Sequence, residues 1–451
     1  MTLRFGTDGI RGVANRELTV ELVTALGRAA ARVLGSHQPF VIGRDTRRSG
    51  PMLEAALVAG LCAEGANALL AGVVPTPAVA HLAARHGGAG AVISASHNAF
   101  ADNGVKLFAP SGRKLPSDAE TRIEEELGRL AVDTPASVAE GSAVGVASEL
   151  RAAVDEYLAH AIAALEGRTL AGLRVVIDCA NGATFRTAPR VLEALGADVT
   201  VLHAAPDGTN INAGCGSMHP DDVRDDVVRT RAHAGLAFDG DGDRVIAVDE
   251  HGETVDGDQI MAILALDFHE RGRLRNNSIA ATVMSNLGLR RALADHGLDM
   301  IETPVGDRHV LDALEEHDLV LGGEQSGHVV IRDLATTGDG LLTGLCVLDV
   351  IFRNRRRLSH LAAVVKRYPQ AQRNVRVADR EALDRDRRFW HSARQVAEQL
   401  GDEGRVLVRP SGTEPMVRIM VEAPSAAQAD EVADWLAAAV QEACGAAAPP
   451  S

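Results

Sequence analysis

The sequence predicts an α/β protein with three similar mixed-sheet domains and a smaller C-terminal α+β domain. Up to about residue 366, short apolar runs alternate with helix-length segments. Several runs are nearly continuous Val, Ile, Leu and Ala, as expected for strands that are covered on both faces. After about residue 370 the expected order becomes strand, helix, strand, strand, helix, which is typical of a short sheet packed on helices.

The expected elements define four blocks. Strands are predicted at 39–43, 67–72, 89–93, 173–178, 198–202, 235–238, 245–248, 279–283, 298–302 and 319–322, and helices include 50–65, 184–196, 257–270, 286–296 and 306–317. In the last block, strands are predicted at 373–377, 404–408 and 416–422, and helices at 380–400 and 425–444. The expected domains are residues 1–148, 149–252, 253–368 and 369–451, with a linker within 133–148 that leads into a helix.

Composition excludes several classes of function. The chain has 451 residues, 46% of them hydrophobic, which is enough to bury a substantial core. Its net charge of −15 argues against a general nucleic-acid binder, although a local cationic pocket is compatible with it. No apolar run of about 20 residues suggests a membrane span. We therefore expect a soluble, cytoplasmic protein that binds neither nucleic acid nor membrane.

The five cysteines lack the close spacing of zinc ligands. They are Cys62, Cys179, Cys215, Cys346 and Cys444. Because they are far apart and odd in number, we expect free and mostly buried thiols in a reducing compartment.

The strongest motif places three carboxylates, Asp239, Asp241 and Asp243, at alternate positions separated by glycines. Alternate residues of an extended segment point the same way, and glycines let the backbone turn. Clustered carboxylates repel one another unless a cation neutralises them, and their oxygens suit Mg²⁺ or Ca²⁺. Strand patterns flank this loop where a calcium loop would have helices, so a metal site at the end of a strand is favoured. A solvated acidic turn is the alternative.

A serine loop follows the apolar run that ends near Val92. Small residues around Ser96 allow a sharp turn that exposes a hydroxyl, with His97 beside it and Lys106 further along. A serine that carries phosphate needs a cation close by. The Gly-x-Ser-x-Gly motif of α/β-hydrolases is missing. Taken alone, this loop is equally compatible with an ordinary Ser/Asn turn.

Two further loops follow expected strands. The segment from Arg409 to Pro415, with Arg418 beyond it, combines hydroxyls, glycine and arginines, which suit phosphate geometry. The segment from Gly322 to His328 contains Glu324 and Ser326, which can hydrogen-bond neighbouring sugar hydroxyls. A plain turn is the alternative for the first of these loops, and the second is a weak signal when taken alone.

Three other features receive simpler interpretations. Residues 6–12 form a polar, glycine-rich loop, and residues 336–340 form the start of a helix. Arg353 and the run 355–357 are interpreted as the solvated end of a helix, where the dipole favours cations.

Taken together, these loops resemble the α-D-phosphohexomutase superfamily. The resemblance covers nearly the whole chain in order, through residues 7–11, 94–98, 239–244, 324–328 and 409–415. Residues 6–12, 178–183 and 323–328 are similar to the phosphoglucosamine mutase branch rather than to phosphomannomutase/phosphoglucomutase. The resemblance implies four domains around a central cleft and interconversion of glucosamine 6-phosphate and glucosamine 1-phosphate. It also implies a place in amino-sugar nucleotide and cell-wall precursor synthesis.

The resemblance also implies roles for individual residues. Ser96 is expected to be the phosphoserine, and its phosphate together with Asp239, Asp241 and Asp243 is expected to hold one Mg²⁺ per subunit. Candidates for proton transfer are His97 and Lys106, and Arg11 and Arg244 are expected to steady the reactive phosphate. The expected substrate-binding residues are Glu324, Ser326, Arg409, Ser411, Gly412, Thr413 and Arg418. A sugar bisphosphate is the expected intermediate and activator.

One residue departs from the family pattern, because Ala99 stands where proline usually follows Ser-His-Asn. Alanine lacks the fixed φ of proline, which predicts a less rigid serine loop and a modest effect on rate. The alternatives for function are a phosphomannomutase or phosphoglucomutase, a phosphatase with an aspartate nucleophile, and a non-catalytic sugar-phosphate sensor. The oligomeric state stays open, with a homodimer as one alternative.

Overall fold

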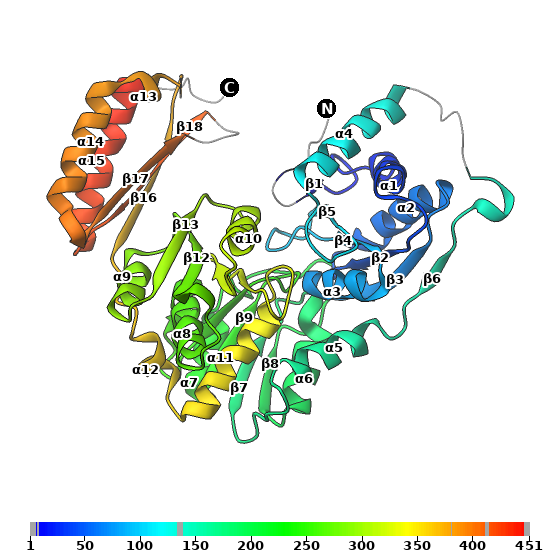
Figure 1. Cartoon of the computed structure of the whole chain (residues 1–451), viewed down its shortest axis with the longest axis horizontal. Helices are drawn as coiled ribbons and strands as arrows, with labels where there is room; N and C mark the ends of the chain where they lie inside the picture. The colour runs from blue at the N-terminus through cyan, green and yellow to red at the C-terminus, as the bar shows by residue number, and fades with distance from the viewer. Residues whose placement is uncertain (1–5, 7–8, 133–138, 380, 411–414, 446–451) are drawn as a thin grey trace. The chain divides into compact units, whose positions relative to one another are not determined.

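The computed structural model describes residues 6, 9–132, 139–379, 381–410 and 415–445, and it confirms the predicted fold class. The chain forms two compact units. The first comprises residues 1–284 and 298–364 and contains three mixed sheets, and the second comprises residues 285–297 and 365–451. The four sheets can be followed in Figure 1.

The first sheet has six strands in the order β1-β5-β4-β2-β3-β6. The strands are β1 (Ile10–Val13), β2 (Phe40–Arg44), β3 (Ala68–Val73), β4 (Ala89–Ile93), β5 (Asp102–Phe108) and β6 (Ala147–Glu149). Helices α1 (Val20–Leu34), α2 (Gly50–Ala63) and α4 (Ser117–Val132) lie on one side and α3 (Thr76–His86) on the other (Figure 1). Apolar side chains of α1, α2 and the strands form the largest core of this sheet.

Two sequence interpretations in this sheet are wrong. Residues 6–12 were expected to form a glycine-rich loop, but residues 10–12 belong to β1, because Ile10 is fully buried and pairs with Val105 of β5. Residues 147 and 148 were expected to be part of a linker, but they pair in parallel with β3 as the edge strand β6. The side chains of β6 are exposed, so backbone pairing alone recruits this segment to the sheet.

The second sheet has the order β11-β10-β9-β7-β8. Its strands are β7 (Arg174–Asp178), β8 (Asp198–Leu202), β9 (Ala234–Phe238), β10 (Val245–Val248) and β11 (Thr254–Val255). The surrounding helices are α5 (Ala153–Ala163), α6 (Ala188–Ala194) and α7 (Asp221–Thr230). Every residue of β9 is buried, which explains its unbroken apolar sequence.

The third sheet has the order β13-β12-β14-β15. Its strands are β12 (Ser278–Thr282), β13 (Asp299–Thr303), β14 (Leu321–Gly323) and β15 (Val329–Ile331). Its helices are α8 (Gly257–Glu270), α10 (Asp307–Glu316), α11 (Gly340–Asn354) and α12 (Leu358–Ala362). Residues 336–340 do lead into a helix as predicted, since Asp339 caps α11 by accepting a hydrogen bond of 2.9 Å from the Leu342 amide.

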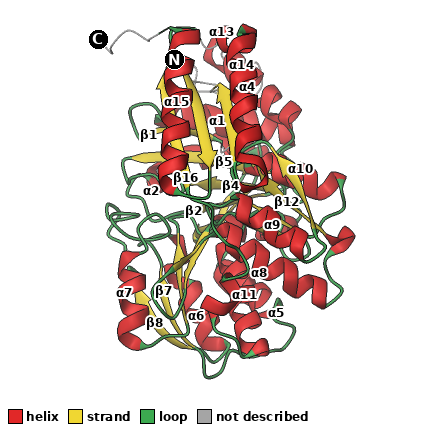
Figure 2. Cartoon of the chain, turned by 90° about the vertical axis from the view of Figure 1, so that its left-hand side faces the viewer, coloured by secondary structure: helices red, strands yellow, loops and turns green. Residues whose placement is uncertain are grey.

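The second unit contains an antiparallel sheet in the order β16-β18-β17. Its strands are β16 (Gln370–Arg376), β17 (Arg405–Pro410) and β18 (Met416–Glu422), and its helices are α9 (Leu287–Asp295), α13 (Ala382–Arg385), α14 (Arg387–Leu400) and α15 (Ala426–Cys444). Helices α14 and α15 cover one face of the sheet (Figures 1 and 2). Glu422, at the end of β18, accepts a hydrogen bond of 3.2 Å from the Leu287 amide at the start of α9.

The four chemical motifs occupy equivalent places in the four sheets. Residues 94–101 join β4 to β5, residues 239–244 join β9 to β10, and residues 324–328 join β14 to β15. Each of these strand pairs is antiparallel and adjacent, as are β17 and β18, which flank residues 411–415. Each of the first three motifs is therefore the loop of a β-hairpin, which holds the loop at both ends by strand pairing, whereas residues 411–414 lie outside the described residues.

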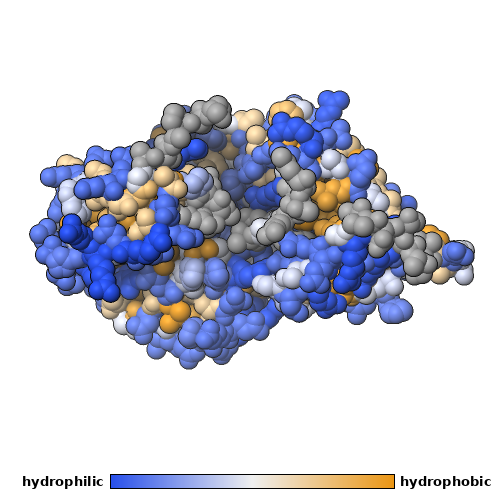
Figure 3. All heavy atoms as spheres, turned by 90° about the horizontal axis from the view of Figure 1, so that it is seen from above, coloured by the Kyte–Doolittle hydropathy of each residue, from blue (hydrophilic) through white to orange (hydrophobic). Residues whose placement is uncertain are grey.

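The face of the molecule seen from above is mostly polar (Figure 3). The face seen in Figure 3 is covered largely by hydrophilic atoms, with small scattered hydrophobic patches. No helix among the described residues is long and apolar enough to cross a membrane. All five cysteines are free, and three of them are buried, as expected.

Candidate active site

Ser96 lies at the turn that leaves the buried strand β4. Its side chain is buried, and its backbone has a φ of 51°, in the left-handed region that non-glycine residues seldom adopt. The Ser96 amide donates a hydrogen bond of 2.9 Å to Ser94 Oγ, which in turn donates one of 2.6 Å to Asp45. These bonds hold the hydroxyl of Ser96 in a defined position. Strain of this kind often marks functional loops.

Arg47 stabilises the serine loop through hydrogen bonds to its backbone. The side chain is fully buried and paired with Asp45, at 2.8 Å. Its NH2 group donates to the carbonyl oxygens of Ser96 and Asn98, at 3.0 and 2.8 Å, and NH1 donates to that of Ala99. Arg47 thus fixes the segment in which alanine replaces the family proline. The loop is restrained by tertiary hydrogen bonds in place of a proline ring.

The acidic loop brings its three carboxylates together as predicted. One oxygen from each of Asp239, Asp241 and Asp243 lies within 4.8 Å of the others, and all three residues are buried. The glycines between them are needed for close approach. A Cβ on Gly240 would stand 2.6 Å from the Ser96 carbonyl oxygen, and Gly242 has a φ of 71°. The acidic loop therefore packs directly against the serine loop.

The acidic loop also contacts the hydroxyl of Ser96. Ser96 Oγ donates a hydrogen bond of 2.5 Å to Asp239 Oδ2. The Oδ1 atoms of Asp241 and Asp243 are buried without a hydrogen-bond partner among the described residues. Unpartnered carboxylate oxygens, clustered beside a hydroxyl, fit a hard divalent cation such as Mg²⁺. These residues would hold the ion together with a phosphate on Ser96.

The pKa values of Asp239 and Asp243 are shifted in opposite directions. Burial, followed by the charges of Asp243 and Asp241, raises the pKa of Asp239 well above its usual range. Burial also acts to raise the pKa of Asp243, but Lys106 and His328 outweigh it, so that this pKa lies well below its usual range. Lys106 is buried, and its Nζ lies 3.1 Å from Asp241 and 3.2 Å from Asp243. The lysine thus supplies part of the positive charge that three buried carboxylates require.

His97 and Arg244 lie beside Ser96. Arg244 NH1 donates a hydrogen bond of 3.1 Å to His97 Nδ1. His97 Nδ1 also lies 3.4 Å from Ser96 Oγ. Burial lowers the pKa of His97, and the charges of Arg244 and Arg11 lower it further. Because arginine can only donate, Nδ1 is an acceptor and the imidazole is neutral at pH 7. This state allows His97 to take a proton.

Replacing Arg244 tests this electrostatic coupling. Arg244→Gln removes a positive charge and is expected to raise the pKa of His97 towards 6.5, although burial still acts. NMR titration of the His97 ring, assigned with a His97→Asn variant, measures the shift. Arg244→Lys, which keeps the charge, is the matched control and should leave the pKa nearer the wild-type value. An unchanged pKa in Arg244→Gln would contradict the assigned contact.

Arg11 belongs to β1 and packs against Gly104 of β5, where a Cβ would stand 2.9 Å from Arg11 Cγ. Its charge acts on the pKa of His97, so the guanidinium lies within interaction range of the serine loop. The structure therefore brings together Ser96, His97, Lys106, Arg11, Arg244 and the three aspartates.

The loop containing Glu324 lies in the same unit. Glu324 Oε1 accepts a hydrogen bond of 3.1 Å from the Gly306 amide, and Oε2 accepts one of 3.3 Å from the exposed Ser326. The loop is joined to the acidic loop, since Val245 donates to the Gly327 carbonyl at 3.1 Å. Both side chains predicted to recognise the sugar therefore occupy one tight turn.

Sequence reasoning missed His328, which follows this turn. The side chain is buried, with Nδ1 3.8 Å from Asp243 and Nε2 3.9 Å from Asp307. Burial lowers its pKa, but Asp243, Asp307 and Glu324 outweigh that effect, so the pKa of His328 is raised. Thr76 was also missed, although its hydroxyl donates to Asp241 at 2.7 Å. His328 ends the motif at residues 322–328, but nothing in that motif indicates its proximity to Asp243, and Thr76 has no local signal because its contact with Asp241 is distant in sequence.

Two arginines of the second unit face each other across the strand pair. Arg409 of β17 and Arg418 of β18 are directly opposite in the antiparallel register. Burial, followed by the charge of Arg418, lowers the pKa of Arg409. Like charges opposite each other destabilise a sheet unless an anion lies between them. The predicted ligands Ser411, Gly412 and Thr413 lie outside the described residues.

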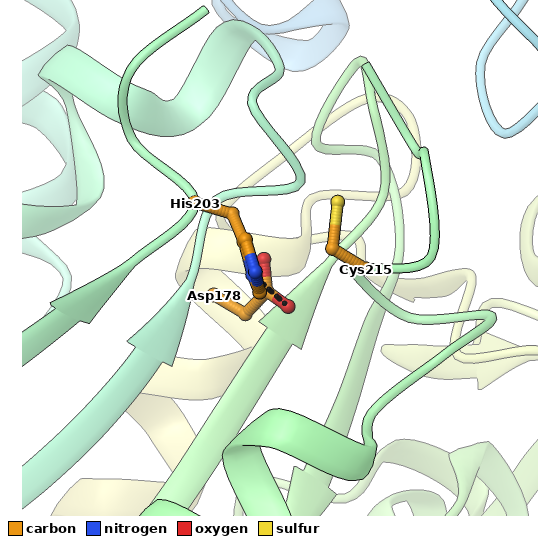
Figure 4. A group of neighbouring side chains, drawn as sticks. All are labelled: Asp178, His203 and Cys215. Carbon is orange, nitrogen blue, oxygen red and sulfur yellow. Dashed lines mark ion pairs between the residues drawn. The ribbon is translucent and has the colours of Figure 1, made fainter. Parts of the chain in front are cut away.

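A polar cluster in the second sheet supports the serine loop. Figure 4 shows Asp178 and His203 facing each other, with Nδ1 3.0 Å from Oδ2, and Cys215 on a neighbouring loop. Asp178 also accepts hydrogen bonds from the amides of Ala180, at 2.7 Å, and Gly216, at 2.8 Å. Burial, followed by the charge of Asp178, raises the pKa of the Cys215 thiol to about 12, so the thiol is protonated at pH 7. Asp178 thus ties together the loops at 178–183 and 210–217.

Asn212 lies on the second of these loops and reaches the serine loop. Its Nδ2 donates to the carbonyl oxygens of Ser96 and Asn98, at 2.9 and 3.1 Å. The φ of Asn212 is 57°, a conformation that asparagine tolerates better than most residues. Sequence reasoning missed Asn212, since nothing in its local sequence indicates a contact with residue 96.

Asn212→Ala is expected to lower kcat about tenfold, because loss of two hydrogen bonds lets the serine loop shift. Steady-state kinetics, with circular dichroism to check the fold, measures the effect. Asn15→Ala is the matched control, since Asn15 also has a positive φ, of 63°, but is exposed. Equal activity in both variants would exclude a positioning role for Asn212.

The comparisons with known proteins agree with this geometry. The chain matches four domains described as phosphoglucomutase/phosphomannomutase: domain I at residues 2–131, domain II at 155–252, domain III at 256–368 and the C-terminal domain at 373–439. It is 51% identical over 432 residues to a phosphoglucosamine mutase of Moorella thermoacetica, covering 95% of this chain and 97% of the relative. It is 48% identical to a phosphoglucosamine mutase of Streptomyces avermitilis, covering 98% of this chain and 99% of the relative.

Solved structures show the same fold. A phosphoglucomutase/phosphomannomutase family protein of Burkholderia thailandensis is 27% identical, covers 100% of both chains and has a TM-score of 0.83. The Aspergillus fumigatus N-acetylphosphoglucosamine mutase, solved in complex with GlcNAc-6P and magnesium, shares the fold at 18% identity with a TM-score of 0.71, covering 98% of this chain and 96% of that one. The chain belongs to the phosphoglucomutase/phosphomannomutase family.

Proposed function

We propose that this protein is a phosphoglucosamine mutase, an isomerase that interconverts glucosamine 6-phosphate and glucosamine 1-phosphate. One observation carries the proposal: Ser96 Oγ lies 2.5 Å from Asp239, within a buried acidic triplet that has two oxygens without a hydrogen-bond partner in the described part of the chain. At this position, a divalent cation would neutralise the charge of a phosphate on Ser96, and the phosphate would in turn supply a ligand to the cation. The curated relatives at about half identity, named phosphoglucosamine mutase, support the choice of substrate.

In the proposed reaction, the free hydroxyl of a sugar monophosphate attacks the phosphate on Ser96. A sugar bisphosphate forms, turns end for end within the site, and returns its other phosphate to Ser96. A trace of that bisphosphate also acts as activator, by phosphorylating any enzyme that has lost its phosphate. Bound Mg²⁺ would supply neutralisation of the charge that develops on the transferring group.

The residues of this chain divide the remaining tasks. His97 is neutral and lies next to Ser96 Oγ, so it is suited to accept the proton of the attacking hydroxyl. Lys106 provides a buried positive charge beside the acidic triplet, and Arg11 and Arg244 steady the reactive phosphate. A preformed charge arrangement of this kind stabilises the transition state without reorganisation.

Recognition of the substrate is assigned to two other loops. Glu324 and Ser326 share a turn and are suited to hydrogen-bond the sugar hydroxyls and amino group. Arg409 and Arg418, with Ser411, Gly412 and Thr413, are proposed to hold whichever phosphate is not reacting. The mutual repulsion of the two arginines would favour an anion between them.

The proposed product supplies amino-sugar nucleotide and cell-wall precursor synthesis, which places the enzyme in the cytoplasm. Its partners are hexosamine phosphates, with neither nucleic acid nor membrane required. A homodimer is one alternative for its assembly, and size-exclusion chromatography with light scattering distinguishes it from a monomer.

A substrate panel tests the proposal. Glucosamine, glucose and mannose 6-phosphates are each incubated with enzyme, Mg²⁺ and a trace of the matching bisphosphate, and formation of the 1-phosphate is followed. We expect kcat/KM for glucosamine 6-phosphate to exceed the others at least about tenfold, because a site built for a polar substituent rejects analogues that lack it. A preference for glucose or mannose phosphate would favour a phosphoglucomutase or phosphomannomutase. Release of inorganic phosphate without isomerisation would favour a phosphatase.

A further inference from the structure

A cavity in the first unit lies apart from the serine and acidic loops. Its volume is about 820 Å³, within the range of sites for small molecules. Its walls come from the start of β7, the segment after α7, the turn between β10 and β11, and the C-terminal end of α11. None of the residues that we assign to the mutase site lines this cavity.

The cavity is strongly cationic in an acidic protein. The arginines that line it are Arg174, Arg231, Arg353, Arg355, Arg356 and Arg357. Only one carboxylate, Glu250, lines it with them, and that side chain already accepts a hydrogen bond of 3.2 Å from the Ser359 amide. Because the whole chain has a net charge of −15, this concentration of arginine is local and not a reflection of overall composition.

Most of these guanidinium groups are not used within the protein. Arg353 is paired with Asp349 and Asp267, at 2.8 and 2.7 Å, and Arg174 donates to the Arg231 carbonyl oxygen at 2.6 Å. The side chains that make no hydrogen bond or ion pair within the described part of the chain are those of Arg231, Arg355, Arg356 and Arg357. Four arginines are therefore available to a ligand.

The helix dipole explains only part of this arrangement. Cations after the last turn of α11 are favoured there, as the sequence interpretation of residues 355–357 supposed. Arg174 and Arg231, however, come from the second sheet and its connections, more than 100 residues away in sequence. Two parts of the chain that are distant in sequence thus contribute arginines to the lining of one cavity. Repulsion between them would be relieved by a bound anion.

The lining also has an apolar part. Leu173 and Ile351 are buried at 7% and 4% exposure, Phe352 is partly buried, and Val228 is exposed. A planar guanidinium binds one phosphoryl group in bidentate fashion, so four available arginines match more than one phosphoryl group. Of these side chains, those of Phe352 and Val228 are accessible enough to contact an organic body attached to those phosphates.

We propose that this cavity binds a nucleoside diphosphate. Such a ligand combines two phosphoryl groups with an apolar ring of a size that the cavity accommodates. Inorganic phosphate would leave the apolar residues uncovered. A nucleic-acid polymer is disfavoured by the charge of the rest of the surface.

The binding of UDP and ADP by isothermal titration calorimetry tests the proposal on the full-length protein. Wild type is expected to bind at least one of them with a Kd below about 1 mM, and Arg356→Ala/Arg357→Ala is expected to weaken binding about tenfold or more. Arg387→Ala/Arg388→Ala removes two adjacent arginines of the second unit and is the matched control, with wild-type affinity expected. Mutase activity of both double variants should stay within about twofold of wild type, which confirms that they are folded.

Further binding measurements distinguish nucleotide binding in this cavity from binding at the mutase site. Excess glucosamine 6-phosphate should not displace the nucleotide, and Arg409→Ala should leave its affinity unchanged. Pyrophosphate should bind at least about tenfold more weakly than the nucleotide, because it cannot cover the apolar residues. The proposal is overturned if wild type and Arg356→Ala/Arg357→Ala bind the nucleotide with equal affinity, or if the sugar phosphate displaces the nucleotide. It is also overturned if pyrophosphate binds as tightly as the nucleotide, or if neither nucleotide shows saturable binding up to about 10 mM.

Discussion

Ser96→Ala is expected to lower mutase activity by about three orders of magnitude or more, equivalent to about 4 kcal/mol of transition-state stabilisation. The variant removes the hydroxyl that lies 2.5 Å from Asp239 at the acidic triplet, and alanine has no atom to carry the phosphate. Coupled assay of glucosamine 1-phosphate formation measures the loss. Intact-mass measurement after incubation with sugar bisphosphate should show the gain of one phosphate in wild type and no gain in the variant.

Ser94→Ala is the matched control for this result. Ser94 is also buried in the serine loop, but its hydroxyl bonds to Asp45 and to the Ser96 amide and not to the acidic triplet. This variant should still gain one phosphate, although its turnover will fall because Ser96 is less firmly positioned. Substantial activity in Ser96→Ala, or phosphate gain there, would refute the phosphoserine assignment.

Asp241→Asn is expected to have the second-largest effect, a fall in kcat of about 100-fold at saturating Mg²⁺. The substitution keeps the shape of the side chain but removes a charge from a triplet whose Asp241 and Asp243 Oδ1 atoms accept no hydrogen bond from any described residue. One fewer negative charge weakens the attraction for a divalent cation. The measurement is kcat as a function of Mg²⁺ concentration.

Metal binding can be followed independently of turnover. Mn²⁺ binding, measured by electron paramagnetic resonance, should weaken at least about tenfold in Asp241→Asn. Asp222→Asn is the control, because Asp222 is an exposed carboxylate outside the acidic triplet and should leave Mn²⁺ affinity unchanged. Wild-type Mn²⁺ affinity in Asp241→Asn would contradict the proposed metal site, whatever its activity.

The sequence determined the fold class and most of the chemistry by local pattern. Continuous apolar runs identified strands such as 89–93 and 245–248 with their observed bounds, since strands covered on both faces need apolar residues throughout. The acidic triplet was evident because alternating carboxylates and glycines are a local signal. By contrast, β1 and β6 were missed, because partly or wholly exposed edge strands lack that signal. The buried strand β5 was missed as well, because Asp102, Asn103 and Lys106 interrupt its apolar sequence.

Only the tertiary structure decided what surrounds those motifs. Arg47, Asn212 and His328 reach the serine or acidic loop across 49, 116 and 85 residues of sequence, through contacts that no local pattern encodes. The loop at Ala99 looked flexible in sequence, yet the buried Arg47 holds it by hydrogen bonds. The arginines at 355–357 are exposed, as the sequence interpretation supposed, but only the tertiary structure brings Arg174 and Arg231 into the lining of the same cavity. Local sequence encodes which groups are available, whereas their burial, charge balance and partners arise from packing of distant segments.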